Sequence, residues 1–329
     1  MKLVLHIGTE KTGTTSIQSW LAANRGILSR RGICLSDVLD RPSNRALAHA
    51  FQEGVDPYLL PKGIVSVDQL RAFRERVTQQ LAEEVAVAAQ THDQMVISSE
   101  QLHSRLLNDR DVKALAAMLG ALFDETTVVC YLRPQLEMRR SLYSTLVRMG
   151  YTGRLENFDA DIDETSLYYN HEALVERWVG AFGRDHLLLR EYARSKLHGG
   201  DVVRDFAAMA LPDLDTSGSD FGRHGENAAL SGVHLTAYRT INRILPYSDG
   251  KGGLRKGNAR AKRVVRTVLA PVAPKLKRHA LSPEEHAVGV AIAARFAASN
   301  HRLSEAFFGG SLFTDAAQSN IEHPVRATN

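Results

Sequence analysis

The stretch that decides the fold stands at the start of the chain: Lys2-Leu-Val-Leu-His-Ile-Gly-Thr-Glu-Lys-Thr-Gly-Thr-Thr-Ser16. Residues 2–7 form a short apolar run, which is typical of a strand buried on both faces. A polar loop rich in Gly and Thr follows, and over residues 14–24 the apolar side chains recur at helical spacing. A strand, a glycine loop and a helix in this order predict the opening of a phosphate-binding α/β fold.

The loop at residues 8–16 has the chemistry of an anion site. Gly8 and Gly13 let the backbone turn tightly and approach a ligand closely. The backbone N–H groups at the start of the following helix attract negative charge. Lys11 lies two positions before the last glycine, whereas the lysine of a Walker motif follows it. Further donors are the hydroxyls of Thr14, Thr15 and Ser16.

Beyond this loop, predicted strands alternate with predicted helices up to about residue 190. We expect strands at 32–35, 95–100, 126–132 and 186–190, and helices at 67–89, 112–123, 135–149 and 172–182. This alternation predicts an α/β fold with a parallel sheet flanked by helices, whose ligands bind beyond the carboxyl ends of the strands. We expect one domain over 1–329, with an α/β core at 1–195 and a mostly helical, loop-rich portion at 196–329.

Two sequence elements resemble the family of sulfotransferases that use 3′-phosphoadenylyl sulfate (PAPS). Lys-Thr-Gly-Thr-Thr at 11–15 is similar to the family's 5′-phosphosulfate loop. The strand at 128–132 ends in Arg133, and Ser141 follows eight residues later, similar to the element that holds the 3′-phosphate. The resemblance implies a P-loop-type fold, PAPS as co-substrate, no metal, and donor binding by Lys11, Thr12, Gly13, Thr14, Thr15, Ser16, Arg133 and Ser141. Arg139 and Arg140 are alternatives to Arg133.

In this family a Glu or His near the end of a central strand takes the proton of the acceptor. Glu100 follows the strand predicted at 95–100 and is the candidate base, with Lys11 as its catalytic partner at the donor. His103 is the alternative base, and Glu10 is a third candidate. A structural role for Glu100 at the start of the next helix stays open. His6 is expected to be a core histidine.

Composition and charge restrict the classes of partner. The formal charge is +4 and the isoelectric point about 9.1, which suits an anionic ligand but does not indicate a nucleic-acid partner. Only two cysteines are present, which favours a reducing compartment. No apolar run has the length of a signal-peptide core or a membrane span, so we expect a cytoplasmic protein.

The acceptor is less defined. The resemblance is greatest to bacterial enzymes that act on saccharides or exopolysaccharide, which implies a hydroxyl or amine of such an acceptor, or of a small molecule. Residues 40–65, 150–170 and 212–226 are the loops expected to contact it. The Lys/Arg-rich segment 250–278 is expected to be a solvated charged face, with a peripheral contact to an anionic glycan or lipid as the alternative. Two other functions stay open: a P-loop kinase that uses ATP, and a non-catalytic anion-binding protein. The oligomeric state is not predicted.

Overall fold

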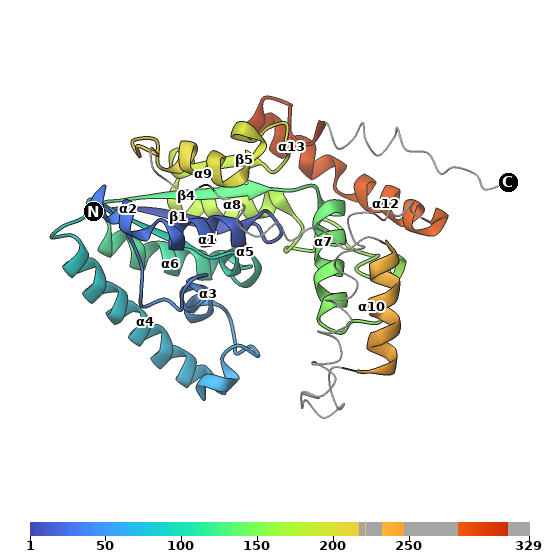
Figure 1. Cartoon of the computed structure of the whole chain (residues 1–329), viewed down its shortest axis with the longest axis horizontal. Coiled ribbons are helices and arrows are strands. Elements are labelled where there is room, and N and C mark those ends of the chain that lie inside the picture. Colours follow the sequence, from blue (N-terminus) through green and yellow to red (C-terminus); the bar gives the residue numbers. More distant parts are fainter. Residues whose placement is uncertain (217–220, 222–231, 247–281, 315–329) are drawn as a thin grey trace. The chain divides into compact units, whose positions relative to one another are not determined.

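The computed structural model describes residues 1–216, 221, 232–246 and 282–314 (Figure 1). The basic segment 250–278 lies outside the described residues, as do 217–220 and 222–226 of the loop expected at 212–226. The chain divides into two compact units. Unit 1 comprises Met1–Arg133, Glu164–Glu226 and Ser299–Leu312, and unit 2 comprises Pro134–Asp163, Asn227–Ala298 and Phe313–Asn329. The expectation of a single domain stays a prediction.

Unit 1 is built on a five-stranded sheet whose paired strands all run parallel. The strand order is β2-β3-β1-β4-β5. After β1 the chain forms β2 and β3 on one side of β1, and then β4 and β5 on its other side. A topological switch point therefore lies beside β1, and open α/β sheets bind ligands at such points. The strands confirm the five predicted ones: β1 (Lys2–Gly8), β2 (Ile33–Leu35), β3 (Gln94–Ser98), β4 (Glu125–Leu132) and β5 (Leu187–Glu191).

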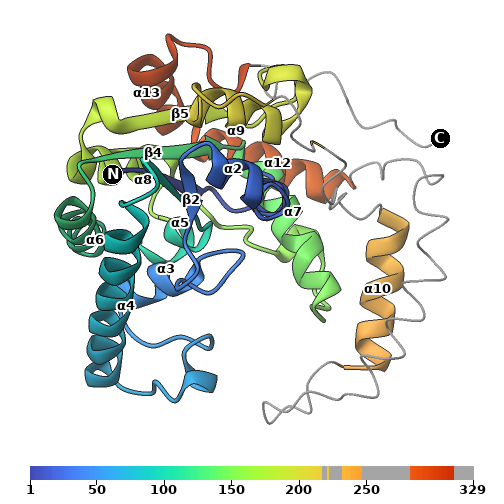
Figure 2. The same ribbon diagram turned by 60° about the vertical axis from the view of Figure 1, so that its left-hand side comes forward.

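Helices cover both faces of this sheet. Figures 1 and 2 show α9 and α6 on opposite sides of it. The helices of unit 1 are α1 (Thr14–Ala23), α2 (Arg25–Arg30), α3 (Arg45–Phe51), α4 (Val67–Ala88), α5 (Gln101–Arg105), α6 (Asp109–Leu122), α8 (His171–Phe182), α9 (Val202–Ala210) and, from Ser299 on, α13 (Ala297–Phe308). Short 3-10 turns are η1 (Leu60–Lys62), η3 (Arg184–His186) and η4 (His198–Gly200).

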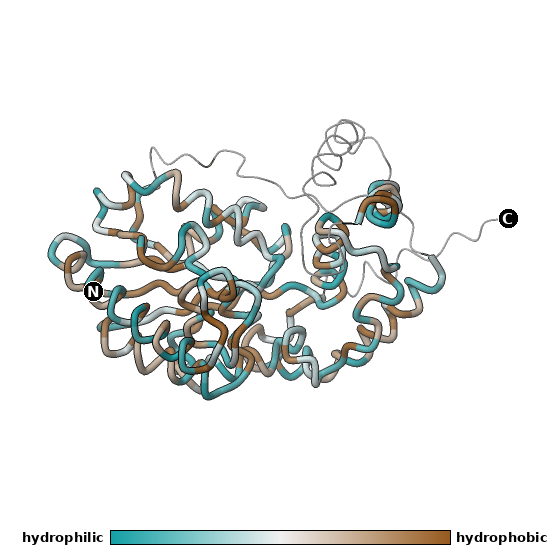
Figure 3. The backbone as a smooth tube through the Cα atoms, turned by 90° about the horizontal axis from the view of Figure 1, so that it is seen from below, coloured by the Kyte–Doolittle hydropathy of each residue, from teal (hydrophilic) through white to brown (hydrophobic). Residues whose placement is uncertain are grey.

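The core on one face of the sheet joins α1 and α9 to the strands. Ile17, Trp20 and Phe206 pack with Val4 and Val129, and none of these side chains is more than 1% exposed. Burial of each such side chain stabilises the fold by roughly 1.5–3 kcal/mol. The strand that begins at the N-terminus is hydrophobic along most of its length (Figure 3). This packing fixes α1, and therefore the loop before it, on the sheet.

Unit 2 is helical in its described part, with α7 (Gln135–Arg148), η2 (Leu155–Asn157), α10 (Gly232–Ile244) and α12 (Pro283–Arg295). Tyr143 and Val147 of α7 pack with Phe158 and Tyr238. Helix α12 begins with a reciprocal capping box between Ser282 and Glu285.

The predicted fold class is confirmed for the described residues: a P-loop-type parallel sheet flanked by helices, followed by a mostly helical C-terminal portion. In the described part of the chain, each helix is too short or too polar to cross a membrane.

Candidate functional site

The loop at residues 8–16 joins β1 to α1 and is tied to the neighbouring strand. The backbone N–H and the hydroxyl of Thr9 both donate to the carbonyl of Tyr131 on β4, at 2.9 and 3.1 Å. The hydroxyl of Thr12 donates to the carbonyl of Thr9 at 2.6 Å. Gly13, with a φ of 77°, ends the loop in the left-handed region and is the N-cap of α1. The side chain of Thr12 therefore holds the loop in shape.

Consecutive backbone N–H groups in this loop have no hydrogen-bond partner in the part of the chain that the structure describes. Among the described residues, nothing accepts a hydrogen bond from the N–H groups of residues 12–15. The first turn of α1 carries no acidic side chain. Unpaired N–H groups together with the positive end of a helix dipole form an anion site, and phosphate is the usual ligand of such a site. The hydroxyl-bearing residues of this turn are Thr14, which is buried, Thr15, which is exposed, and Ser16, which is half-buried.

Arg133 and Lys11 meet at this loop. The guanidinium of Arg133 donates to the carbonyl of Lys11 at 2.8 Å, which brings the carboxyl end of β4 to the loop after β1. Lys11 has a left-handed backbone, with a φ of 69°. The Arg133 guanidinium also lies 5.5 Å from the ring centroid of Tyr192, a cation–π distance. Arg133 is thus bound to the backbone of Lys11, the other cationic residue predicted to bind the donor.

Tyr192, which follows β5, closes the loop from another side. Its N–H donates to the carbonyl of Leu132 at 2.7 Å. A Cβ added at Gly13 would lie 3.2 Å from the Tyr192 hydroxyl and 2.8 Å from Cγ1 of Val202 on α9. Only glycine leaves room for this approach.

Glu100 lies directly after β3, next to the start of the loop. A Cβ added at Gly8 would be 3.3 Å from the Cα of Glu100, so the two strand ends are in contact. One carboxylate oxygen of Glu100 accepts a 2.7 Å hydrogen bond from the amide of Gln18, and the other accepts one of 3.1 Å from Gln101. The Glu100 side chain makes no capping bond to α5. Its half-buried carboxylate is held beside the anion site.

His103 is completely buried behind the loop. Its Nδ1 accepts a hydrogen bond from the N–H of Glu10 at 3.4 Å, and its Nε2 lies 2.9 Å from the carbonyl of Tyr168, to which it donates. Burial lowers the pKa of His103 to about 4, so the ring is neutral near pH 7. The Tyr168 hydroxyl in turn donates to the Glu10 carboxylate at 2.9 Å. His103 and Tyr168 therefore hold the backbone and the side chain of Glu10.

His6 lies within the sheet. Its Nδ1 is 2.8 Å from the hydroxyl of Ser98, and its ring packs against Tyr131 and Phe206. Burial lowers the pKa of His6 to about 3. These contacts are those of a core histidine, as the sequence predicts.

The second half of the predicted donor site crosses the boundary between the two units. Arg133 is the last residue of this part of unit 1, whereas Ser141 lies on α7 in unit 2, so their pairing stays a prediction. Arg139 is buried, and its Nε donates to the carbonyl of Phe158 at 2.6 Å, within unit 2. Arg140 precedes Ser141 and has no hydrogen-bond partner among the described residues. Burial lowers the pKa of Arg140, against the attraction of nearby carboxylates.

The sequence prediction missed Gln18 and Tyr192. Gln18 is 5% exposed, although it lies on a helix whose polar residues are expected to face water. Tyr192 follows the strand predicted at 186–190, and a search of every strand end for polar residues could have found it. Nothing in the sequence marks Gln18, because its role depends on the pairing of β1 with β3.

Comparisons with known proteins give weak structural likenesses. No model of a protein family and no curated protein matches this chain. A sulfotransferase from Alicyclobacillus acidocaldarius is 16% identical with a TM-score of 0.39, over 73% of this chain and 91% of that one. The sulfotransferase domain of the olefin synthase of Synechococcus PCC 7002 is 13% identical with a TM-score of 0.32, over 80% and 94%. The sulfotransferase domain from the curacin biosynthetic pathway is 10% identical with a TM-score of 0.29, over 88% and 96%. At these values the likeness assigns no activity to this chain.

Proposed function

We propose that the chain transfers a sulfuryl group from PAPS to a hydroxyl or amine of an acceptor. The observation that carries the proposal is the row of N–H groups at residues 12–15, at the start of α1, from which no described residue accepts a hydrogen bond. The Glu100 carboxylate is held at the neighbouring strand end. An anion site beside a fixed carboxylate supplies both parts that sulfuryl transfer requires. One part stabilises the leaving phosphate, and the other takes a proton from the nucleophile.

The reaction needs one bond to form and one to break. The acceptor oxygen or nitrogen bonds to sulfur, and the bond between sulfur and the bridging phosphate oxygen breaks. The acceptor's proton passes to Glu100, and 3′-phosphoadenosine 5′-phosphate (PAP) leaves. Lys11 stabilises the negative charge that develops on the bridging oxygen, together with the donors of residues 12–16. Arg133 and Ser141, with Arg140 as a neighbour on α7, are proposed to bind the 3′-phosphate.

The hydrogen bonds favour Glu100 over His103 as the base. Both ring nitrogens of His103 are engaged by backbone groups, which leaves neither for a substrate proton. The carboxylate oxygens of Glu100 accept hydrogen bonds from the uncharged amides of Gln18 and Gln101, so neither donor neutralises the charge of the carboxylate. Each oxygen has a further lone pair for an acceptor hydroxyl. We therefore assign His103 the role of positioning Glu10 and the loop.

We propose a saccharide-type acceptor and a cytoplasmic enzyme, as the sequence resemblance implies. A turnover assay tests the proposal: PAP release from PAPS is followed by chromatography with a mixture of neutral oligosaccharides, in the presence of EDTA. ATP with Mg²⁺ is assayed in parallel. The proposal expects PAP release and incorporation of sulfate into a saccharide. Phosphate transfer from ATP instead would support the P-loop kinase, and nucleotide binding without any turnover would support a non-catalytic protein.

A further inference from the structure

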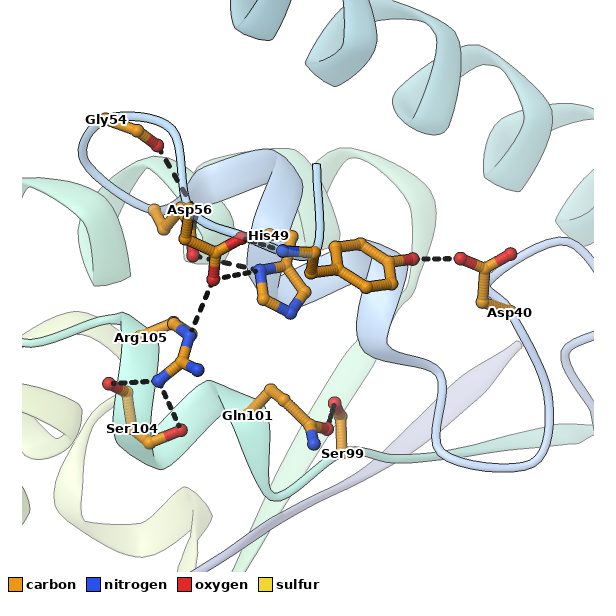
Figure 4. A network of polar contacts seen from close by, with 10 residues as sticks. Asp40, His49, Gly54, Asp56, Ser99, Gln101, Ser104 and Arg105 are labelled. Atoms are coloured by element: carbon orange, nitrogen blue, oxygen red, sulfur yellow. Dashed lines mark hydrogen bonds and ion pairs between the residues drawn. The ribbon is translucent and has the colours of Figure 1, made fainter. Parts of the chain in front are cut away.

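A second polar cluster in unit 1 centres on His49 of α3 (Figure 4). The His49 side chain is 3% exposed. Its Nδ1 lies 3.1 Å from the Asp56 carboxylate and 3.0 Å from the amide oxygen of Gln52. This cluster lies within residues 40–65, the first of the loops expected to contact an acceptor.

The partners of Nδ1 fix the tautomer of the His49 ring. The amide nitrogen of Gln52 donates to the carbonyl of Gly54 at 3.1 Å, so its oxygen faces His49. Asp56 also offers only an acceptor. With two acceptors at Nδ1, the proton resides on Nδ1, and Nε2 carries a lone pair. Nothing in the described part of the chain donates to this Nε2.

The ring is held firmly by its neighbours. Asp56 also accepts hydrogen bonds from Nε of Arg105 and from the N–H of Tyr58, both at 3.0 Å. The Tyr58 ring stacks on the His49 ring with 4.0 Å between centroids, and the Tyr58 hydroxyl donates to Asp40. Burial lowers the pKa of His49, although Asp56 opposes this effect while Arg105 adds to it. The imidazole is therefore neutral and oriented.

The His49 ring belongs to the part of unit 1 that surrounds Glu100. The amide oxygen of Asn44, which precedes α3, accepts from the N–H of Ser98 at 3.1 Å. Helix α3 packs on α5, which starts directly after Glu100. In Figure 4 the Nε2 of His49 lies on the side of the ring that faces Gln101, whose amide donates to Glu100. His49 therefore lies on a helix that packs against the helix following the proposed base.

Each of the two carboxylates of the cluster is paired with a cation. Arg105 pairs with Asp56 at 3.0 Å, and Lys62 pairs with Asp40 at 2.9 Å. An anionic ligand would meet these carboxylates and the imidazole lone pair. A neutral hydroxyl offers the donor that a lone pair on Nε2 requires.

We propose that His49 binds a hydroxyl group of a neutral, hydroxyl-rich acceptor of the saccharide class through its Nε2. The hydroxyl donates to the imidazole while Glu100 serves the hydroxyl that is sulfated. This inference rests on the proposed function for its biological meaning, but the site itself is defined by His49, Gln52 and Asp56 alone.

The test uses the whole protein, labelled with ¹⁵N in its histidines. Long-range ¹H–¹⁵N spectra report the tautomer of His49, which is expected to carry its proton on Nδ1. The protein is then titrated with methyl α-D-glucopyranoside, and separately with D-glucuronate as the anionic counterpart, each with and without PAP. The Nε2 resonance of His49 is expected to move with the neutral glycoside and not with glucuronate. A proton on Nε2, no response to the glycoside, or an equal response to glucuronate would overturn the proposal.

Two variants add a functional comparison. Gln places an amide oxygen near the position of Nε2, so His49→Gln should bind the glycoside within about threefold of wild type, while His49→Leu should bind about tenfold more weakly. His301→Leu, on an exposed part of α13, is the control. Equal binding by His49→Leu and wild type contradicts the proposal. Calorimetry with PAP on the same samples separates the two claims, because loss of PAP binding with an intact His49 response refutes only the proposed donor.

Discussion

The side-chain amide of Gln18 donates a 2.7 Å hydrogen bond to one carboxylate oxygen of Glu100. Gln18 lies on α1, and no described residue accepts a hydrogen bond from the N–H groups at the start of that helix. The same amide also lies 3.4 Å from the carbonyl of Ser98 at the end of β3. One buried side chain thus connects the proposed donor site to the proposed base.

Replacement of Gln18 should affect catalysis more than nucleotide binding. In Gln18→Leu the Glu100 carboxylate loses its shortest hydrogen bond, so we expect kcat to fall about tenfold while the affinity for PAP stays within about twofold. Gln18→Glu should be slower still, because it places a like charge at hydrogen-bond distance. Steady-state kinetics with PAPS, with PAP calorimetry on both variants, provide the measurement. An unchanged kcat in Gln18→Leu would show that this hydrogen bond has no catalytic role.

Glu100→Gln should abolish proton transfer without disturbing the fold. The amide has nearly the shape of the carboxylate but takes no proton, and we expect kcat to fall by about 10²–10⁴ with unchanged PAP binding. Glu75→Gln, at an exposed position on α4, is the matched control and should retain full activity. If Glu100→Gln is as active as this control, Glu100 is not the base.

Gly13→Ala should damage the loop through both conformation and space. The new Cβ would take a left-handed φ of 77° and lie 2.8 Å from Val202. We expect the free energy of unfolding to fall by about 1–3 kcal/mol and PAP affinity to fall more than about tenfold. Gly63→Ala is the matched control, because Gly63 has a φ of 74° but open space around its Cβ position. Urea unfolding and calorimetry of the pair separate backbone strain from the steric clash, and equal PAP affinities in both variants would contradict the expected approach of Val202.

Buried neutral histidines should make the protein sensitive to acid. Burial lowers the pKa of His103 from 6.5 to about 4, so the unfolded chain binds a proton at a higher pH than the folded one. The contribution of His103 to stability is therefore complete above pH 6.5 and is lost as the pH falls toward 4, by about 3 kcal/mol in total. The same direction holds for His171, whose pKa burial lowers to about 4.

Urea unfolding between pH 4 and 7 measures this effect. In His103→Gln the free energy of unfolding should depend less steeply on pH in this window, because unfolding takes up fewer protons, by up to about one. His301→Gln, at an exposed site, should leave the slope unchanged. An unaltered slope in His103→Gln would mean that His103 is not buried as a neutral ring.

Much of the sheet could be predicted because its strands are short apolar runs that end at distinct residues. Residues 2–7 end at Gly8, and residues 126–132 end at Arg133-Pro134. In a parallel sheet these ends fall on one edge, which is why the loop, Glu100 and Arg133 could be grouped in advance. This grouping depends only on the order of the strands along the chain and on their common direction, and both can be inferred from the sequence pattern.

The partners of these residues could not be predicted, because they depend on contacts between distant segments. Helix α3 has only seven residues, in a stretch rich in turn-forming residues, so helical periodicity does not reveal it. The orientation of His49 depends on Asp56 beyond the turn that follows α3. Gln18 bonds to Glu100 across 82 residues of sequence. Such pairs follow from the packing of α1 and α3 on the sheet, which no local pattern specifies.

The most direct test of the central claim is to measure PAP binding by calorimetry, without metal, to wild type, Lys11→Ala and Arg133→Ala. Lys113→Ala, on the exposed face of α6, is the control, and ADP is the ligand with which PAP is compared. The proposed function predicts that wild type and the control bind PAP in preference to ADP, and that Lys11→Ala and Arg133→Ala each lose about tenfold or more in affinity. Equal affinity for ADP and PAP, or nucleotide binding that requires Mg²⁺ and is unaffected by Lys11→Ala, would contradict it.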